Sequence, residues 1–264
     1  MKKVLFTFVT IALFSITSCT SKKEQKEAHK KETHPHWTYQ GETSPEHWAE
    51  IEKNSDCDGK SQSPINIIDI HVKPTQQKEN PLNILYSPKT ELNQVINNGH
   101  SIQFNFEAGD SIQYHGDTYH LMQIHFHESS EHTINGIRYP LEIHLVHKNK
   151  TNEYTVMGIL AQEGEESQLF EFFESFLPIA ENKTKEIHQS LDLATLFPQN
   201  TDFYSYGGSL TTPPCTESVN WVIFKNPIIV SVEEVLKLKN NMPKNNYRNE
   251  QPLNGRVVSL NIHD

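Results

Sequence analysis

The chain of 264 residues is short of basic residues, of internal repeats and of clustered glycine or proline. Its 23 Lys and Arg are outnumbered by 33 Asp and Glu, and this acidic balance opposes the positive surface that phosphate binding requires. No repeat with a period of 20 to 50 residues is visible, which excludes a repeat architecture. Because the 14 Pro and 11 Gly are spread along the chain, most of it is expected to be globular, with a length that permits one large domain or two small ones.

The first 35 residues are expected to be a leader and a tether. Residues 1–18 join a basic MKK to the apolar VLFTFVTIALFSIT, a pattern typical of a signal peptide and too short for a spanning helix. The stretch ends in ITSC, which resembles the lipobox of bacterial lipoproteins and makes Cys19 the expected site of lipidation; an ordinary secretory signal with an incidental cysteine is the alternative. Residues 19–35 are polar and charged and predict a flexible tether. The expected location is therefore outside the cytoplasm, on a bacterial membrane held by lipid alone, facing the periplasm or the exterior.

Removing the leader and the tether sharpens two expectations for residues 36–264. Two Lys leave with the leader, and five Lys and three Glu leave with the tether, so 16 basic and 30 acidic residues remain and no nucleic acid is expected as a partner. With Cys19 committed to lipid, Cys57 and Cys215 remain as a pair that can form a disulfide in an oxidising compartment; two free thiols are the alternative.

Short stretches of alternating apolar and polar residues predict many strands beyond residue 36. In SIQFNFEAG, Ile102, Phe104 and Phe106 share a face, and similar alternation occurs in HLMQIHFH, LEIHLVH, YTVMGILAQ and SVNWVIFK. Turn signals such as Asn98-Gly99 and Asn135-Gly136 separate them. The pattern favours one predominantly β domain.

Two segments are expected to be helical. Residues 231–242 follow Ser231, a good N-cap, and residues 166–182 carry an apolar stripe at helical spacing. This stripe is expected to pack in the core; it consists of Leu169, Phe172, Phe173 and Phe176.

One predicted hairpin, residues 123–147, holds five of the 15 histidines. Packing alone explains such a group poorly, because a buried imidazole needs partners for both nitrogens; a metal site, a proton relay and chance composition are the possibilities. Residues two apart share a strand face. Gln123, His125 and His127 therefore line one side of the first strand, and Glu142 and His144 share a side of the second.

If the two strands are antiparallel neighbours, His125, His127 and His144 converge on one point. Three imidazoles with a fourth position left to water is the arrangement of catalytic zinc sites. Gln123 and Glu142 lie two residues from a ligand on the matching faces, where they can accept the other ring N–H. His132 and His147 lie on the turn or on the opposite strand face from the three ligands. They are expected to be structural or surface histidines.

The histidine pattern belongs to a series of segments that resembles the α-class carbonic anhydrases. In chain order these are HWTY, SPEHW, SQSPINI, NNGHSIQ, QIHFHESSEHTING, LEIHLVH, GSLTTPPCTESVNW and QPLNGR, which extend over nearly all of residues 36–258. The resemblance implies the α-carbonic anhydrase fold for residues 36–264, a large, mostly antiparallel twisted sheet with a few short peripheral helices. It also implies reversible hydration of carbon dioxide to bicarbonate and a proton by zinc-bound hydroxide, with Zn²⁺ on His125, His127 and His144 at the base of a conical cavity.

The resemblance assigns further roles around the metal. Gln123 and Glu142 hold His125 and His144, and the Thr211 hydroxyl donates to Glu131 while it accepts from the zinc-bound group. Zinc lowers the pKa of bound water to about 7, and carbon dioxide, being apolar, needs only a hydrophobic slot beside the metal. Sulfonamides and anions are expected to inhibit at the zinc. Thr212 borders the substrate site, and the apolar wall is formed by Val146, Val156, Leu210, Val219 and Trp221.

Turnover also requires a proton to leave. His100 matches the family's shuttle histidine, whose imidazole titrates near neutral pH; a surface loop histidine is the alternative. Tyr39, Asn98 and Gln103 match polar positions that organise the water chain to the shuttle.

The chain departs from animal relatives in two respects. Glu128 replaces a tryptophan that many of them carry, so aromatic packing is in doubt there. The loops are shorter, as in bacterial members, where the matches of Cys57 and Cys215 are typically bridged.

Related binding or adhesion modules without activity are the alternative class, but they typically lose a zinc histidine. A purely structural zinc would need a fourth protein ligand. A monomer or homodimer is expected.

Overall fold

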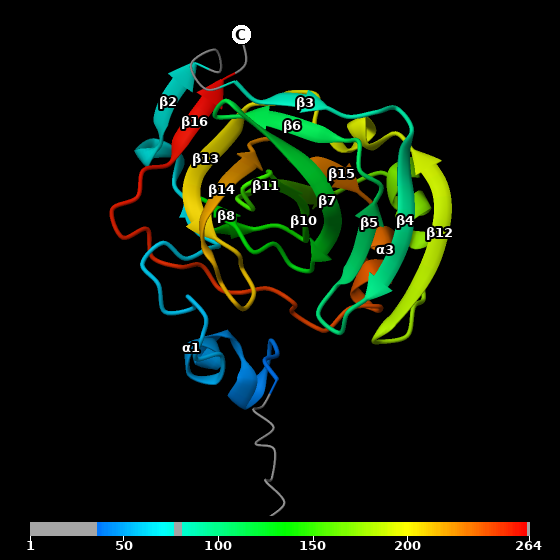
Figure 1. Cartoon of the computed structure of the whole chain (residues 1–264), viewed down its shortest axis with the longest axis horizontal. Helices are drawn as coiled ribbons and strands as arrows, with labels where there is room; N and C mark the ends of the chain where they lie inside the picture. Colours follow the sequence, from blue (N-terminus) through cyan, green and yellow to red (C-terminus); the bar gives the residue numbers. More distant parts are fainter. Residues whose placement is uncertain (1–35, 77–80, 263–264) are drawn as a thin grey trace, which may run out of the picture. The chain divides into compact units, whose positions relative to one another are not determined.

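A mixed sheet of 13 strands forms the frame of the molecule. The computed structural model describes residues 36–76 and 81–262; the expected signal peptide and tether, with Cys19, lie outside the described residues. Along the sheet the strands follow the order β12-β4-β5-β7-β10-β11-β14-β13-β16-β2, while β3, β6 and β15 attach beside this path. Figure 1 shows the sheet curving around its own concave face. The predominantly β fold expected from the sequence is confirmed.

Most neighbouring strands are antiparallel, but β11 with β14, β11 with β15 and β16 with β2 pair in parallel. The strands of this sheet are β2 (Lys73–Gln76), β3 (Asn83–Leu85), β4 (Thr90–Asn97), β5 (Ile102–Phe106), β6 (Ser111–Tyr114), β7 (Asp117–His127), β10 (Leu141–Lys148), β11 (Tyr154–Glu163), β12 (Lys183–Leu191), β13 (Phe203–Ser209), β14 (Glu217–Phe224), β15 (Ile228–Val230) and β16 (Ser259–Ile262). A second sheet of three strands joins β1 (Asn66–Ile67), β8 (Thr133–Ile134) and β9 (Ile137–Arg138).

The turns predicted between strands are present where glycine permits them. Gly99 has φ of 83° between β4 and β5, and Asn135 and Gly136 have φ of 52° and 77° between β8 and β9. Two consecutive residues with positive φ match the twist of a tight hairpin, which favours Asn-Gly. These turns fix the register of the strands that they join.

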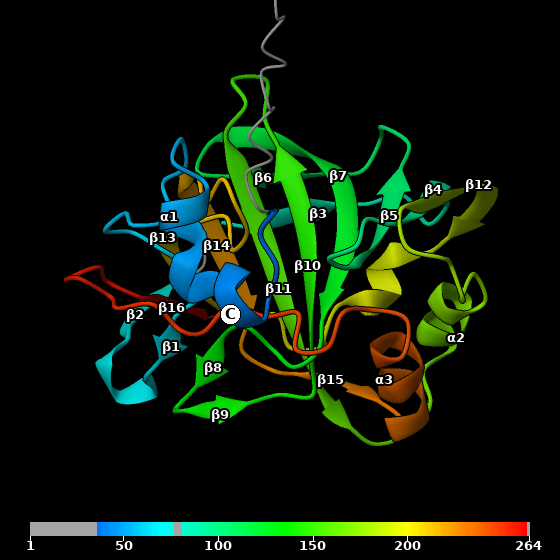
Figure 2. The same ribbon diagram turned by 90° about the horizontal axis from the view of Figure 1, so that it is seen from below.

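The helices are short and peripheral. They are α1 (Trp48–Ile51), α2 (Gln168–Glu174) and α3 (Val232–Lys239), with 3₁₀ turns at Gly41–Thr43, Pro45–His47, Asp69–His71 and Leu193–Leu196. In both Figure 1 and Figure 2, α2 and α3 lie together near β4, β5 and β12. Among the described residues, no helix combines the length and apolarity that a membrane crossing requires.

The sequence predicts the beginning of α3 correctly but makes α2 too long. Ser231 caps α3 in a capping box with Glu234. α2 covers only 168–174 of the expected 166–182, since Pro178 cannot continue a helix and the Ser175 hydroxyl donates to the Phe172 carbonyl at 2.7 Å. Phe170 is fully buried along with Phe173, so the buried stripe differs by one position from the predicted one.

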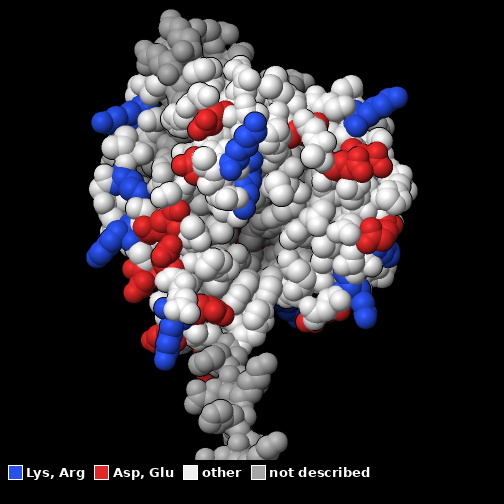
Figure 3. Space-filling model, viewed as in Figure 1, with Lys and Arg blue, Asp and Glu red and all other residues white. Residues whose placement is uncertain are grey.

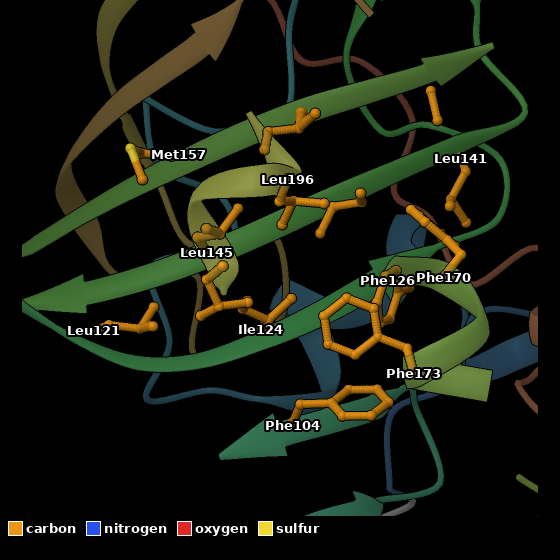
Figure 4. Close-up of a cluster of buried hydrophobic side chains, with 14 of the residues drawn as sticks. Phe104, Leu121, Ile124, Phe126, Leu141, Leu145, Met157, Phe170, Phe173 and Leu196 are labelled. Carbon is orange, nitrogen blue, oxygen red and sulfur yellow. The ribbon is translucent and has the colours of Figure 1, made fainter. Parts of the chain in front are cut away.

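The main hydrophobic core lies on one face of the sheet. Phe126 of β7 packs against Phe170 and Phe173 of α2, and the same cluster includes Ile124 of β7 with Leu141 and Leu145 of β10. Figure 4 shows this contact, with Phe170 and Phe173 facing the strands. Because strand side chains alternate, the intervening residues of β7 and β10 point to the opposite, concave face. That face carries His125, His127 and His144.

Candidate metal centre

Strands β7 and β10 bring three histidines to one point. His144 pairs with His125 in the antiparallel register, and Glu142 pairs with His127. One ring nitrogen of each of the three histidines lies within 4.8 Å of those of the other two, a spacing that a single metal ion can bridge. The centroids of the His127 and His144 rings are 4.6 Å apart. The convergence predicted from side-chain parity is therefore present.

Hydrogen bonds to the other nitrogen of each ring determine which nitrogen is free. His125 Nδ1 donates to Gln123 Oε1 at 2.9 Å, and His144 Nε2 donates to Glu142 Oε1 at 2.8 Å. His127 Nδ1 donates to the backbone carbonyl of Asn246 at 2.6 Å. Because these oxygens are acceptors, the unprotonated nitrogens are Nε2 of His125, Nε2 of His127 and Nδ1 of His144.

Burial keeps all three rings neutral. It lowers the pKa of His127 to about 4 and the pKa of His144 below its ordinary value. The pKa of His125 is lowered well below the ordinary range, first by burial and then by repulsion from the other two rings. A metal ion can therefore bind without displacing protons from imidazolium groups.

The donor set fits zinc with an open position. His127 Nε2 is buried and has no hydrogen-bond partner among the described residues, as expected for a ligand atom facing a metal. The histidine triplet gains no fourth Cys, Asp, Glu or His in the described ranges. Three imidazoles with one position left over is the pattern of catalytic zinc rather than of a closed structural site.

Glu142 is fixed by four donors. Besides His144, its carboxylate accepts from the His132 ring at 2.7 Å and from the backbone N–H groups of Glu131 and His132 at 2.7 and 2.8 Å. Burial would raise the pKa of Glu142, but the two histidines outweigh it and hold the pKa well below its usual range. The carboxylate is therefore a rigid anionic acceptor behind His144.

His132 and His147 are structural histidines, and both are fully buried rather than at the surface. His132 links Glu142 to the Tyr206 hydroxyl, 2.7 Å from its Nε2. His147 points to the main core, where its Nε2 lies 2.5 Å from the Tyr86 hydroxyl. Neither extends the histidine triplet.

Glu131 lies between the histidines and Thr211. Its Oε1 accepts the Arg248 backbone N–H at 2.8 Å, and its Oε2 is 3.5 Å from His127 Nε2. Burial raises the pKa of Glu131 to about 7, whereas His144 and the Thr211 hydroxyl lower it. Thr211 is thus beside this carboxyl, although no hydrogen bond of ordinary geometry joins them and Oε2 has no partner within the described residues.

A cavity of about 200 Å³ opens beside the histidines. Its lining includes Thr211 and Thr212, and Val219 is buried in the same apolar cluster without lining the cavity. Figure 3 shows the matching face, where charged side chains lie around a hollow whose walls are largely uncharged. The apolar wall predicted from the sequence is present on one side of the cavity; the members that line it are Val146, Val156, Leu210 and Trp221.

The residues expected to carry protons lie on the β4–β5 turn, on β5 and in the N-terminal segment. His100 stacks on Trp37. The Tyr39 hydroxyl has a pKa well above its usual value, through burial and through the nearby charge of Glu131. Asn98 uses its amide oxygen to accept two backbone N–H groups of the turn, and Gln103 donates to Asn105 at 2.7 Å. Tyr39 thus lies near the site and Gln103 is the cross-strand partner of His125, while the described contacts of Asn98 are local.

Asn246 has a role that sequence reasoning missed. Its backbone carbonyl orients His127, its side-chain oxygen accepts the Glu128 N–H at 2.8 Å, and its amide donates to the carbonyls of Phe126 and His100. The only feature of the sequence that could have indicated this role is its position shortly before the QPLNGR segment. One residue therefore ties a histidine of the triplet to the turn that carries His100.

Glu128, where aromatic packing was in doubt, makes an ion pair. Its side chain is buried, and Oε1 pairs with Lys239 of α3 at 2.7 Å. The side chain at this position therefore links β7 to a helix by charge.

Cys57 and Cys215 form a disulfide, as predicted. The bond holds the N-terminal segment against the loop that follows Thr211 and Thr212, and the Asp56 N–H adds a hydrogen bond to the Pro214 carbonyl at 2.9 Å. The loop is thus fixed from outside the sheet.

The curved sheet and the cavity beside its three histidines define a class of mostly β protein with a candidate metal centre. Comparisons with known proteins agree. The family profile of eukaryotic-type carbonic anhydrase matches residues 43–262. The carbonic anhydrase of Pectobacterium carotovorum is 35% identical over 225 residues, covering 84% of this chain and 90% of that protein, and that of Neisseria gonorrhoeae is 36% identical over 228 residues, covering 85% and 88%.

Solved structures show the same likeness. The α-carbonic anhydrase of Thermovibrio ammonificans, in complex with the inhibitor sulfanilamide, has a TM-score of 0.80 at 37% identity and covers 85% of this chain and 98% of its own. The α-carbonic anhydrase of Photobacterium profundum has a TM-score of 0.77 at 33% identity, with coverage of 84% and 99%. The chain belongs to the eukaryotic-type, or α, carbonic anhydrase family. It is accordingly a carbonic anhydrase, a lyase that hydrates carbon dioxide.

Proposed function

We propose that the chain hydrates carbon dioxide reversibly at a zinc ion held by Nε2 of His125, Nε2 of His127 and Nδ1 of His144. The observation that carries the proposal is the set of three neutral, buried nitrogens left free by their hydrogen-bonded partners beside an apolar cavity. Zinc supplies hydroxide at neutral pH by lowering the pKa of bound water to about 7.

Thr211 and Glu131 set the direction of hydrogen bonding at the cavity floor. A Thr211 hydroxyl that donates to the free Oε2 of Glu131 has only lone pairs left, so it accepts from a reacting group and cannot donate to it. The buried position of Glu131, held by the Arg248 N–H, keeps its carboxyl in place for that contact. The pair thus selects one orientation of the reactants.

The apolar residues of the cavity hold carbon dioxide without a charged group. Val146, Val156 and Trp221 are each less than a tenth exposed and form one side of the cavity next to Thr212. An apolar, linear molecule gains most from such a wall, whereas the bicarbonate product is charged and is released to water.

Each hydration event releases one proton, and His100 is the proposed carrier. It is half-buried on the β4–β5 turn, where Tyr39 contacts it edge to face at a centroid distance of 6.4 Å. Tyr39, Asn98 and Gln103 are the polar groups proposed to order water between the cavity and His100.

Stopped-flow measurement of carbon dioxide hydration tests the proposal. The zinc-loaded protein should accelerate hydration far above buffer, and a primary sulfonamide should abolish the acceleration, in line with the sulfanilamide complex of the Thermovibrio ammonificans relative. Hydration no faster than buffer would contradict the proposed function.

We further propose export and lipid anchoring at Cys19. The disulfide between Cys57 and Cys215 supports an oxidising compartment, because such bonds persist outside the reducing cytoplasm. Mass spectrometry of the mature N-terminus should find a diacylated Cys19; a chain that still begins at Met1 would contradict the proposal.

A further inference from the structure

His100 is joined to a second imidazole. Its Nε2 lies 2.9 Å from Nε2 of His36, and its ring stacks on Trp37 with centroids 3.7 Å apart and planes 14° apart. Trp37 is buried against Trp48, so the surface that holds the His100 ring is itself fixed by the core. The contact between the two imidazoles is therefore positioned by packing.

The 2.9 Å contact requires the two rings to share a proton. A hydrogen bond between two Nε2 atoms forms only when one carries hydrogen and the other offers its lone pair. The ring pair thus holds one proton in the bond and leaves a second nitrogen on each ring for exchange. Such an arrangement passes one proton along the bond, after which both rings are in their other tautomers and must reorient before the next proton can follow.

The two rings differ in exposure, and this difference gives the transfer a direction. His100 is half-buried, whereas His36 is exposed to solvent. Burial, followed by repulsion from His36, lowers the pKa of His100 to about 4, below the near-neutral value expected from the sequence, so a positive charge is held poorly there. His100 also lines a cavity of about 640 Å³, whose charged lining residues are Glu181 and Lys244.

We propose that His36 is the exit group that delivers to solvent the proton accepted by His100. His100 accepts a proton on Nδ1 and passes the hydrogen on its Nε2 to Nε2 of His36, so that His100 is left neutral in its other tautomer. His36, now an imidazolium, releases its Nδ1 proton to a buffer base, which completes the transfer of one proton. The relay rests on the proposed function, because it serves the proton that hydration releases.

Isotope exchange at chemical equilibrium tests the relay, since it measures two rates in one sample. One is the interconversion of carbon dioxide and bicarbonate, and the other is the proton-dependent release of labelled oxygen into water. In His36→Ala and in His36→Gln, the release rate in dilute buffer should fall at least about threefold while interconversion is unchanged. Added imidazole should restore the release. The control is His188→Ala, an exposed histidine on β12, which should match the wild type.

The His36→Gln variant distinguishes a proton relay through His36 from a role of His36 in only positioning His100. Its amide can keep a hydrogen bond to His100 but cannot carry the proton onward. Wild-type release in His36→Gln would show that His36 only positions His100 and would overturn the relay. Equal loss of both rates would do the same, because it would show damage to the site. Absence of interconversion in the wild type would instead reject the proposed function.

A titration of the metal-free protein gives a readout that is independent of activity. The imidazole proton signals of His100, followed by NMR, should move to a higher pKa in His36→Gln, since repulsion from His36 lowers it in the wild type. An unchanged His100 titration would show that the two rings are not coupled and would overturn the relay.

Discussion

At the scale of single residues, five histidines of one hairpin differ in function because their second ring nitrogens meet different groups. His125, His127 and His144 each donate to an oxygen and keep one nitrogen free. His132 bonds through both nitrogens, to Glu142 and to the Tyr206 hydroxyl. A histidine's role is therefore determined by its partners rather than by its neighbours in sequence.

Removing the Glu142 carboxylate should weaken the metal site. In Glu142→Gln one carboxylate oxygen becomes an NH₂ group, which cannot accept from the N–H groups that face it, so the dissociation constant for zinc should rise by about 10-fold to 100-fold. Competition with a chromogenic chelator measures it. Glu163→Gln, at the exposed end of β11, is the matched control and should bind zinc like the wild type. Unchanged affinity in Glu142→Gln would show that the carboxylate does not support His144.

His147 should make stability depend on pH. Burial lowers its pKa to about 3, whereas an unfolded histidine titrates near 6.5. Between these values only the unfolded chain binds the proton, so the free energy of unfolding falls as the pH drops from about 6.5 toward 3.

Urea unfolding at pH 7 and pH 5 checks this dependence. His147→Gln loses the ring contact with Tyr86 and should be less stable at pH 7, but its loss of stability on acidification should be smaller than that of the wild type by about 2 kcal/mol. His188→Gln, an exposed histidine, should follow the wild type. If His147→Gln and the wild type lost the same stability on acidification, His147 would not be the group responsible for the pH dependence.

At the scale of elements, side-chain parity in β7 and β10 could be predicted because a strand has a period of two residues. The sequence therefore places Gln123 and Glu142 beside the ligands. It does not reveal Asn246, since the bond from His127 reaches across 119 residues and depends on the path of the chain after α3. It also leaves open whether His132 is buried, because residues on a turn have no fixed side.

The segment after α3 should be essential for holding β7 in place. Asn246→Ala keeps the backbone carbonyl that orients His127 but removes side-chain bonds to Glu128, Phe126 and His100. The free energy of unfolding should fall by about 2–4 kcal/mol, because buried groups lose their partners.

Asn246→Asp provides a sharper comparison. Its carboxylate still accepts from the Glu128 N–H but cannot donate to the Phe126 and His100 carbonyls, so it should also be destabilised in urea unfolding. Wild-type stability in both variants would show that these hydrogen bonds do not hold the segment.

At the scale of the whole molecule, the order of the sequence motifs was enough to predict the fold. The segments of the chain are tied together by contacts between residues that are distant in sequence. The disulfide closes a separation of 158 residues between the N-terminal segment and the loop after Thr211 and Thr212. The same segment contributes Tyr39, Trp37 and His36. Stability and the geometry of the site are therefore coupled through one bond.

Loss of this disulfide should lower both stability and activity. In the double variant Cys57→Ala, Cys215→Ala the chain-entropy relation gives a loss of about 4–5 kcal/mol in the free energy of unfolding. The hydration rate should also fall at temperatures where the variant remains folded, because the loop carrying Thr211 is released. Urea unfolding and stopped-flow hydration measure the two effects. A stable variant with full activity would show that the loop is held by other contacts.

The most direct measurement is zinc content and hydration rate determined together in one preparation before and after chelation. The wild type should bind about one zinc ion per chain, lose hydration when zinc is removed and regain it when zinc returns. His144→Ala should lose both zinc and rate. Hydration that persists without metal, or full zinc content in His144→Ala, would contradict the three-histidine site.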